Sequence, residues 1–236
     1  ARMKAALEAL GFDSNKLEVL LGQLVNLIIS GEQDRMGKRK KMITLEDLVN
    51  DVGVDATRYW MIMRSIDTTL DFDVDLAKSN TDENPVFYVQ YAHARACSIL
   101  RNAVATRLNQ DTQEILPPYF THEQLEEIIS ADKFNIDINA LWDEKDEKSL
   151  NATKTLLLKL EAFQDTVQTA ARCRTPYIIA RYVQELAGDF HHFYTFSRVL
   201  NVEESIMKAR LALVAATKQV IFNGLNLLGV SAPEKM

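Results

Sequence analysis

A run of cations between two patterned segments is the part of this chain best suited to chemistry. Residues 35–42 read Arg-Met-Gly-Lys-Arg-Lys-Lys-Met, after an apolar stretch and before a helix start at Thr44. A lysine ammonium is a compact charge that can stabilise the negative charge growing on a leaving phosphate group. A glycine-containing loop can bring such a lysine to the phosphates when it is needed. A solvated basic turn is the plainer interpretation of the same residues.

Two side chains in the middle of the chain could bind an unpaired RNA base. Asn84-Pro85 predicts a helix to about residue 108, because asparagine caps helices and proline is favoured at their first position. Its apolar stripe comprises Val89, Ala92, His93, Ala96, Ile99, Leu100, Ala103 and Val104. That stripe leaves Tyr91 and Arg95 one turn apart on the opposite face. The pair could stack on a base and hydrogen-bond to it, or form an ordinary surface contact.

The polar clusters elsewhere do not predict a metal site. His191 and His192 are adjacent, so on a helix they point about 100° apart. Asp71, Asp73 and Asp75 lack the glycine and final glutamate of a calcium loop, so we expect them to be helix caps and salt-bridge partners.

Composition favours an ordinary helical protein. Of 236 residues, 47% are hydrophobic and 25% charged, with only eight glycines and five prolines. Residues 24–29 are the longest apolar run, far short of the roughly 20 residues that a membrane span needs. The lone cysteines Cys97 and Cys173 are expected to be buried free thiols. The net charge of −6 disfavours nucleic acid as a partner of the whole surface, but a local basic face remains compatible with it.

The elements that position these residues are predicted from caps and periodicity. A helix over residues 1–10 ends at Gly11, and a strand follows over residues 17–21, with residues 22–29 as a second short strand or its continuation. One helix and one or two strands cannot form a sheet with both faces covered, so this part is expected to end a larger α/β domain. From Thr44 on the pattern is helical, with Asp55 as a second N-cap. The further helices are expected over residues 45–52, 56–64, 85–108, 122–130, 138–142, 148–174, 176–198 and 203–228.

The helix over residues 176–198 has a second core stripe. It comprises Ile179, Tyr182, Val183, Leu186, Phe190 and Phe193. Tyr194 falls at the edge of this stripe, where its ring could pack on the bundle and still reach outward.

Taken together, the motifs resemble bacterial-type arginyl-tRNA synthetases. The cationic segment resembles the KMSKS loop of class I synthetases, with Met36 and Lys38 in register. The other matching segments are Gly-Val-Asp-Ala-Thr-Arg-Tyr at 53–59, Leu-Asp-Phe-Asp at 70–73, Tyr-Val-Gln-Tyr-Ala-His-Ala-Arg at 88–95 and Gly-Val-Ser-Ala-Pro-Glu-Lys-Met at 229–236.

The resemblance implies a mainly α chain, the carboxy-terminal part of an arginine–tRNA ligase. Residues 1–64 would be the end of a class I Rossmann-type catalytic domain with its KMSKS-like loop and stem-contact helices. Residues 65–83 would connect it to a DALR-type α-helical anticodon-binding domain at 84–236. The intact enzyme would use ATP with Mg²⁺ to attach arginine to its tRNA. We expect this chain alone to be inactive, to hold no cofactor tightly, and to be a cytoplasmic monomer without membrane contact.

The same resemblance assigns residues to the ATP-binding loop. Met36, Gly37, Lys38 and Arg39 take its positions, with Lys38 as the catalytic lysine. Arg35, Gly37 and Arg39 stand where the signature has lysine, serine and serine, so loop closure is expected to differ in detail.

The implied anticodon contacts are Tyr91, Arg95, Tyr194 and the last residue, Met236. The competing interpretation is a non-catalytic, synthetase-like helical module that binds RNA or a protein. A helical scaffold with no RNA role is a third.

Overall fold

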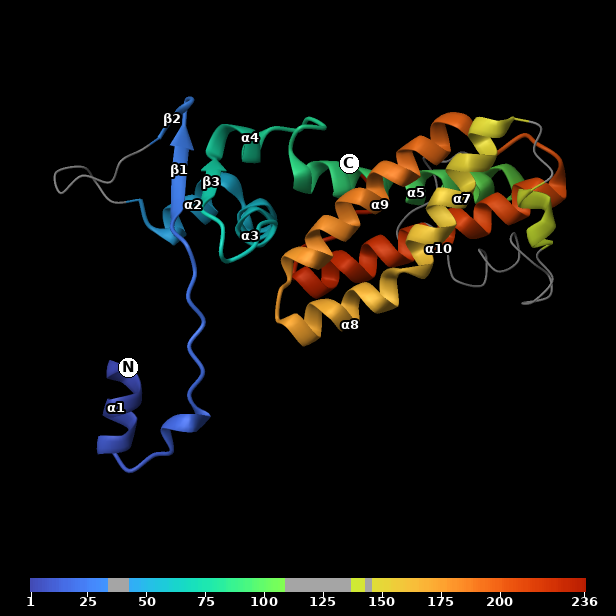
Figure 1. The fold of residues 1–236 in the computed structure, drawn as a ribbon. Helices are drawn as coiled ribbons and strands as arrows, with labels where there is room; N and C mark the ends of the chain where they lie inside the picture. Colours follow the sequence, from blue (N-terminus) through green and yellow to red (C-terminus); the bar gives the residue numbers. More distant parts are fainter. Residues whose placement is uncertain (34–42, 109–136, 143–145) are drawn as a thin grey trace.

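The computed structural model describes residues 1–33, 43–108, 137–142 and 146–236 (Figure 1). The proposed loop residues Met36, Gly37, Lys38 and Arg39 lie outside these ranges, as does the helix expected over residues 122–130.

The first part of the chain forms a small sheet and one separate helix. α1 (Arg2–Ala9) has no buried residue, and Figure 1 shows it apart from the remaining elements. The strands are β1 (Val25–Ile29), β2 (Glu32–Gln33) and β3 (Leu70–Asp73). They lie in the order β2-β1-β3, with β1 antiparallel to β2 and parallel to β3. Between α1 and β1 lies only the 3₁₀ turn η1 (Ser14–Lys16) and an extended segment.

The strand expected over residues 17–21 is wrong. These residues pair with no strand in the described part of the chain, and Leu20 and Leu21 are 62% and 80% exposed. Pairing begins later, because β3 aligns with β1 from Val25 opposite Leu70. An apolar run becomes a strand only where a partner offers hydrogen bonds, and that partner comes from a distant part of the sequence.

Three short helices adjoin the sheet: α2 (Leu45–Val52), α3 (Val54–Ile62) and α4 (Val74–Lys78). Thr44 caps α2 as predicted, in a capping box with Asp47, and Gly53 ends it with φ +94°. The predicted cap at Asp55 is wrong, because Gly53 is already the N-cap of α3 and Asp55 lies in its first turn. Asp73 caps α4 as predicted, accepting from the Leu76 N–H at 2.9 Å.

The rest of the described chain is a helical bundle (Figure 1). Its elements are α5 (Pro85–Leu108), η2 (Ile138–Leu141), α7 (Glu147–Glu161), α8 (Phe163–Cys173), α9 (Tyr177–Phe196) and α10 (Glu204–Leu228). α10 ends as predicted at Gly229, which adopts the left-handed conformation with φ +68°.

The single helix expected over residues 148–174 is divided into α7 and α8. Ala162 ends one and starts the other with ψ −6°, away from the helical value. The break lets both segments pack against α9. Tyr182 of α9 also donates its hydroxyl to the Lys159 carbonyl at 2.6 Å, which occupies an acceptor in the last turn of α7.

The predicted core stripes of α5 and α9 are confirmed. Every residue of both stripes is buried, including His93 at 1% exposure. Cys97 is buried as expected, and burial raises the pKa of its thiol to about 12. The matching expectation for Cys173 is wrong, because this residue ends α8 and is exposed.

One core connects the sheet region to the bundle. Tyr59 of α3 is fully buried and donates its hydroxyl to the Ala180 carbonyl of α9 at 2.9 Å. Trp60 donates its ring N–H to the Asn84 side chain, which in turn donates to the Ala77 and Ser79 carbonyls. The chain is therefore held against α3 and α4 at Asn84, the residue directly before α5.

Among the described helices, α10 alone has the length and apolar composition that could cross a membrane. Within the bundle, however, it is a central helix, with Leu211, Val214, Ile221 and Leu225 buried. A core helix passes the same length and composition test, so its apolar character is explained by packing.

Candidate nucleic-acid interface

The structure brings Tyr91, Arg95 and Tyr194 together. Arg95 lies on α5 one turn after Tyr91, and its guanidinium carbon is 5.5 Å from the centroid of the Tyr91 ring. The same carbon is 4.5 Å from the centroid of the Tyr194 ring on α9. The Arg95 guanidinium therefore contacts two aromatic rings from two helices, a geometry in which each ring face attracts the cation.

Arg95 has no acidic partner in the described part of the chain. The ion pairs there join other residues, such as Lys159 with Glu185 and Arg174 with Glu18. Its side chain is half-buried and therefore partly desolvated, and its guanidinium donates to no acceptor among the residues that the structure describes. A guanidinium in this state suits the acceptor edge of a base or a phosphate oxygen.

The aromatic surface extends beyond the three predicted residues. Phe87 lies one turn before Tyr91, and their rings stack with centroids 6.0 Å apart and planes 6° apart. His191 lies against Tyr91 at 5.7 Å and against Tyr88 at 5.0 Å. We call Phe87, Tyr91, Arg95, His191 and Tyr194 the aromatic–arginine cluster. The sequence signal for Phe87 was its i, i+4 spacing from Tyr91, whereas nothing local pointed to His191.

Tyr91 and Arg95 are less open than the helix pattern predicted. Both are half-buried, because α9 packs beside α5 and brings His191 and Tyr194 against them. Tyr194 is 37% exposed, as expected for a residue at the edge of its core stripe. The face of α5 opposite its core stripe thus forms one part of an aromatic surface, and α9 supplies the other part.

His191 supports this surface as a neutral ring. Burial lowers its pKa, and the nearby Arg95 charge lowers it further, while Asp82 and the Tyr88 backbone act in the opposite direction. Both ring nitrogens are buried and make no hydrogen bond of acceptable geometry with the described residues. A neutral His191 adds no repulsion to Arg95, which helps to keep the cation between the two tyrosines.

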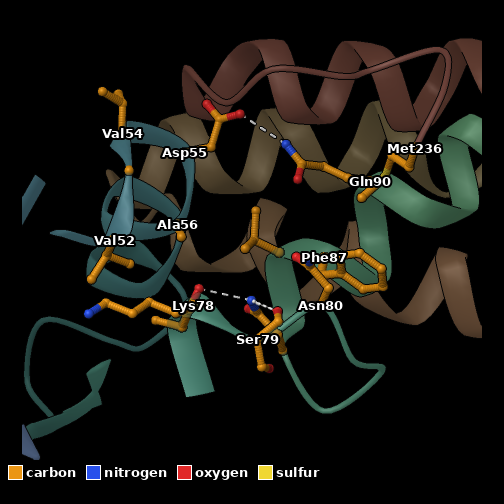
Figure 2. Close-up of a pocket in the computed structure, with 14 residues that line it drawn as sticks. Val52, Val54, Asp55, Ala56, Lys78, Ser79, Asn80, Phe87, Gln90 and Met236 are labelled. Atoms are coloured by element: carbon orange, nitrogen blue, oxygen red, sulfur yellow. Dashed lines mark hydrogen bonds between the residues drawn. The ribbon is translucent and has the colours of Figure 1, made fainter. Parts of the chain in front are cut away.

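Met236 lies beside the cluster rather than within it. It is 53% exposed and lines a pocket of about 460 Å³ bounded by the start of α3, the end of α4 and the start of α5 (Figure 2). Phe87 connects the two places, because it lines the pocket and stacks on Tyr91.

Metal ligands are not gathered anywhere in the residues that the structure describes. Within those ranges no three His, Cys, Asp or Glu side chains are placed to hold an ion. Asp71 accepts from the Asn26 side chain at 2.8 Å and Asp75 from the Ser30 N–H at 2.6 Å, so these carboxylates have structural partners.

Comparison with known proteins assigns the class and then the family. Residues 121–236 match the family model described as the DALR anticodon binding domain. Over its whole length the chain is 47% identical to the arginine–tRNA ligase of Carboxydothermus hydrogenoformans and 44% identical to that of Desulfitobacterium hafniense, covering 38% of each. A solved Campylobacter jejuni chain assigned as an arginyl tRNA synthetase is 29% identical, with a TM-score of 0.74 over all of this chain and 44% of that one.

The chain is thus mainly α and carries an anticodon binding domain of the DALR class. Over its whole length it is similar to arginyl-tRNA synthetases. The resemblance drawn from the sequence motifs is confirmed. The chain spans 38% of the length of the curated relatives named above.

Proposed function

We propose that this chain is the tRNA-binding part of an arginine–tRNA ligase, and that the aromatic–arginine cluster contacts the anticodon loop. One observation carries the proposal: Arg95 lies between the Tyr91 and Tyr194 rings without an acidic partner among the described residues. The name of the DALR family and the names of the relatives support the choice of an anticodon as ligand.

Each member of the cluster has a distinct role in this proposal. An unpaired anticodon base stacks on Tyr194, the more exposed ring, while Tyr91 backs the guanidinium from the other side. Arg95 donates N–H groups to a base edge or to the adjoining phosphate. Stacking of this kind is worth about 1–3 kcal/mol per base, enough to decide between related loops.

The catalytic part of the proposal rests on the resemblance. Met36, Gly37, Lys38 and Arg39 would form the loop that closes on ATP, with Lys38 stabilising the leaving pyrophosphate. Arginine and ATP with Mg²⁺ would be held mainly by the portion of the ligase that precedes this chain in its relatives. We propose that residues 1–64 are the end of the catalytic domain, that residues 65–83 are a connection, and that residues 84–236 are the anticodon-binding domain. The protein is proposed to act as a cytoplasmic monomer.

The proposal is tested by measuring binding of the chain to an arginine-accepting tRNA transcript and to the same transcript with substituted anticodon bases. We expect tighter binding to the unaltered transcript, and no arginine-dependent pyrophosphate exchange by this chain alone. Equal affinity for both transcripts would rule out anticodon recognition.

The length of the natural reading frame distinguishes the ligase hypothesis from the hypothesis of a non-catalytic module. A natural reading frame that continues upstream through a nucleotide-binding domain supports the ligase. One that begins near Ala1 supports an RNA-binding module that acts without catalysis.

A further inference from the structure

The segment from residue 229 to 236 has no helix or strand but is held in one path by three helices. At its start, Arg58 of α3 donates from Nε to the Leu228 carbonyl at 2.6 Å. Gly229 follows with φ +68°, and a Cβ at this position would lie 2.5 Å from Arg58 Nε. Glycine therefore meets two needs here: a left-handed backbone and close approach of the arginine.

Gln90 joins this segment to α3. Its Nε2 lies 2.9 Å from Asp55 Oδ2, as Figure 2 shows, and 3.0 Å from the Ser231 carbonyl oxygen. Both partners can only accept, so the amide must present its NH₂ group to them. Ser231 completes the arrangement, donating its backbone N–H to Asp55 Oδ1 at 3.1 Å and its hydroxyl to the other carboxylate oxygen.

The next residues of the segment are held by side chains from α5 and α10. His93 Nδ1 lies 2.9 Å from the Pro233 carbonyl oxygen, which fixes the proton on that nitrogen because a carbonyl only accepts. Arg101 donates to the Glu234 carbonyl at 3.2 Å, and Lys218 lies 3.8 Å from the Glu234 carboxylate. Lys235 and Met236 come directly after the last of these contacts.

These contacts place Met236 at the pocket described above. Gln90, Phe87 and Met236 all line it, and Figure 2 shows Met236 close to Gln90. Gln90 also directly precedes Tyr91 in α5, so one turn of this helix carries a residue that holds the segment and a ring of the cluster.

We propose that Gln90 is a positioning residue for anticodon binding. By joining Asp55 to Ser231 it fixes the path of residues 229–236, and this path sets the Met236 side chain at the pocket that Phe87 of the aromatic–arginine cluster also lines. The inference rests on the proposed function and adds a specific claim: Gln90 acts through Met236. If the segment only stabilised the fold, changes at Gln90 and Met236 would affect binding independently.

A double-mutant cycle on the full 236-residue chain tests this claim, using Gln90→Ala, Met236→Ala and the double variant. Each is assayed for binding to the arginine-accepting tRNA transcript, with melting temperature measured alongside. Loss of a hydrogen-bonded position typically weakens binding about fivefold. We expect losses of that size for both single variants, and a double variant no weaker than Gln90→Ala, because a misplaced Met236 has no contact left to lose.

Two further variants keep the test decisive. Gln219→Ala removes a glutamine from the exposed face of α10, where its partner is Asn223, and should leave tRNA affinity unchanged. Ser231→Ala removes one hydroxyl and keeps both backbone contacts of that residue, so it should fold even if Gln90→Ala does not. Its smaller loss of affinity should likewise disappear when Met236 is alanine.

Multiplicative losses in the double variant, or full affinity in Gln90→Ala and Ser231→Ala, would overturn the positioning role. In either case a parent chain that still discriminates between anticodons leaves the proposed function standing. A parent chain without such discrimination would overturn both.

Discussion

The guanidinium of Arg95 on α5 lies 4.5 Å from the centroid of the Tyr194 ring on α9, so two helices far apart in the sequence share one binding surface. Neither residue forms this surface by itself. Mutants of the two residues should therefore differ in how they bind RNA, because a ring and a cation contribute to RNA binding in measurably different ways.

Replacement of the exposed ring should remove a stacking platform. Tyr194→Ala is expected to weaken binding to the arginine-accepting tRNA by about 1–3 kcal/mol, with little change for a tRNA carrying an unrelated anticodon loop. Tyr177→Ala is the matched control, because this tyrosine begins α9 at the opposite end of the helix from Tyr194. Filter binding or fluorescence titration of both variants measures the difference. Equal losses for the two variants would argue against a stacking role for Tyr194.

Arg95 should reveal its ligand through salt dependence. If Arg95 meets a phosphate, Arg95→Ala reduces the slope of log affinity against log salt by about one counterion. If it meets a base edge, the slope stays and discrimination between anticodons falls. Arg181→Ala removes an exposed arginine of α9 that pairs with Glu185, and should change neither quantity. An Arg95→Ala variant with parental slope and parental discrimination would place the anticodon site elsewhere.

Stability should fall as the pH drops below about 6.5. Burial lowers the pKa of His93 and of His191 from the ordinary value of 6.5, so the unfolded chain binds protons at a pH where the folded chain does not. The free energy of unfolding is therefore at its full value above pH 6.5 and decreases as the pH falls toward the lowered values. Urea unfolding at a series of pH values measures the slope. His191→Phe and His93→Gln should each flatten it, and parental slopes in both would contradict the assignment.

Two helical glycines should respond in opposite directions to alanine. A Cβ at Gly224 of α10 would lie 2.3 Å from Val183 Cγ1 of α9, so Gly224→Ala is expected to cost about 1–3 kcal/mol through overpacking. A Cβ at Gly188 of α9 would meet only the Tyr88 hydroxyl, at 3.5 Å. Gly188→Ala should therefore stabilise the chain by up to about 1 kcal/mol through helix propensity. Denaturant midpoints of the two variants that shift in the same direction would contradict this reading of α9–α10 packing.

The role proposed for Lys38 can be tested in the intact ligase. Lys38→Ala should lower the rate of arginyl-adenylate formation, with arginine affinity and folding nearly unchanged. Loss of one contact to developing charge typically costs about 3 kcal/mol at the transition state. Pyrophosphate exchange and pre-steady-state kinetics separate the rate from the affinity. An equal loss of arginine binding would remove Lys38 from this role.

The sequence by itself determined the elements whose signals are local. Thr44 with Asp47, Asn84 with Pro85, and Gly229 are local sequence signals for helix ends, and all three ends lie where they were predicted. The α5 stripe predicted burial of His93 because helical periodicity alone decides which face turns inward. The family followed from short motifs in their order, as the relatives confirm.

Tertiary structure decided whatever depends on a partner far away in the chain. β1 begins at Val25 because β3 pairs with it there, and the helix expected over residues 148–174 breaks at Ala162, where both halves pack against α9. The same holds for the binding surface. The sequence predicted Tyr91 and Arg95 as a pair on one helix and Tyr194 on another. Tyr194 and His191 joined that pair only because α5 and α9 lie side by side. Such contacts are set by the packing of whole helices, which no local pattern encodes.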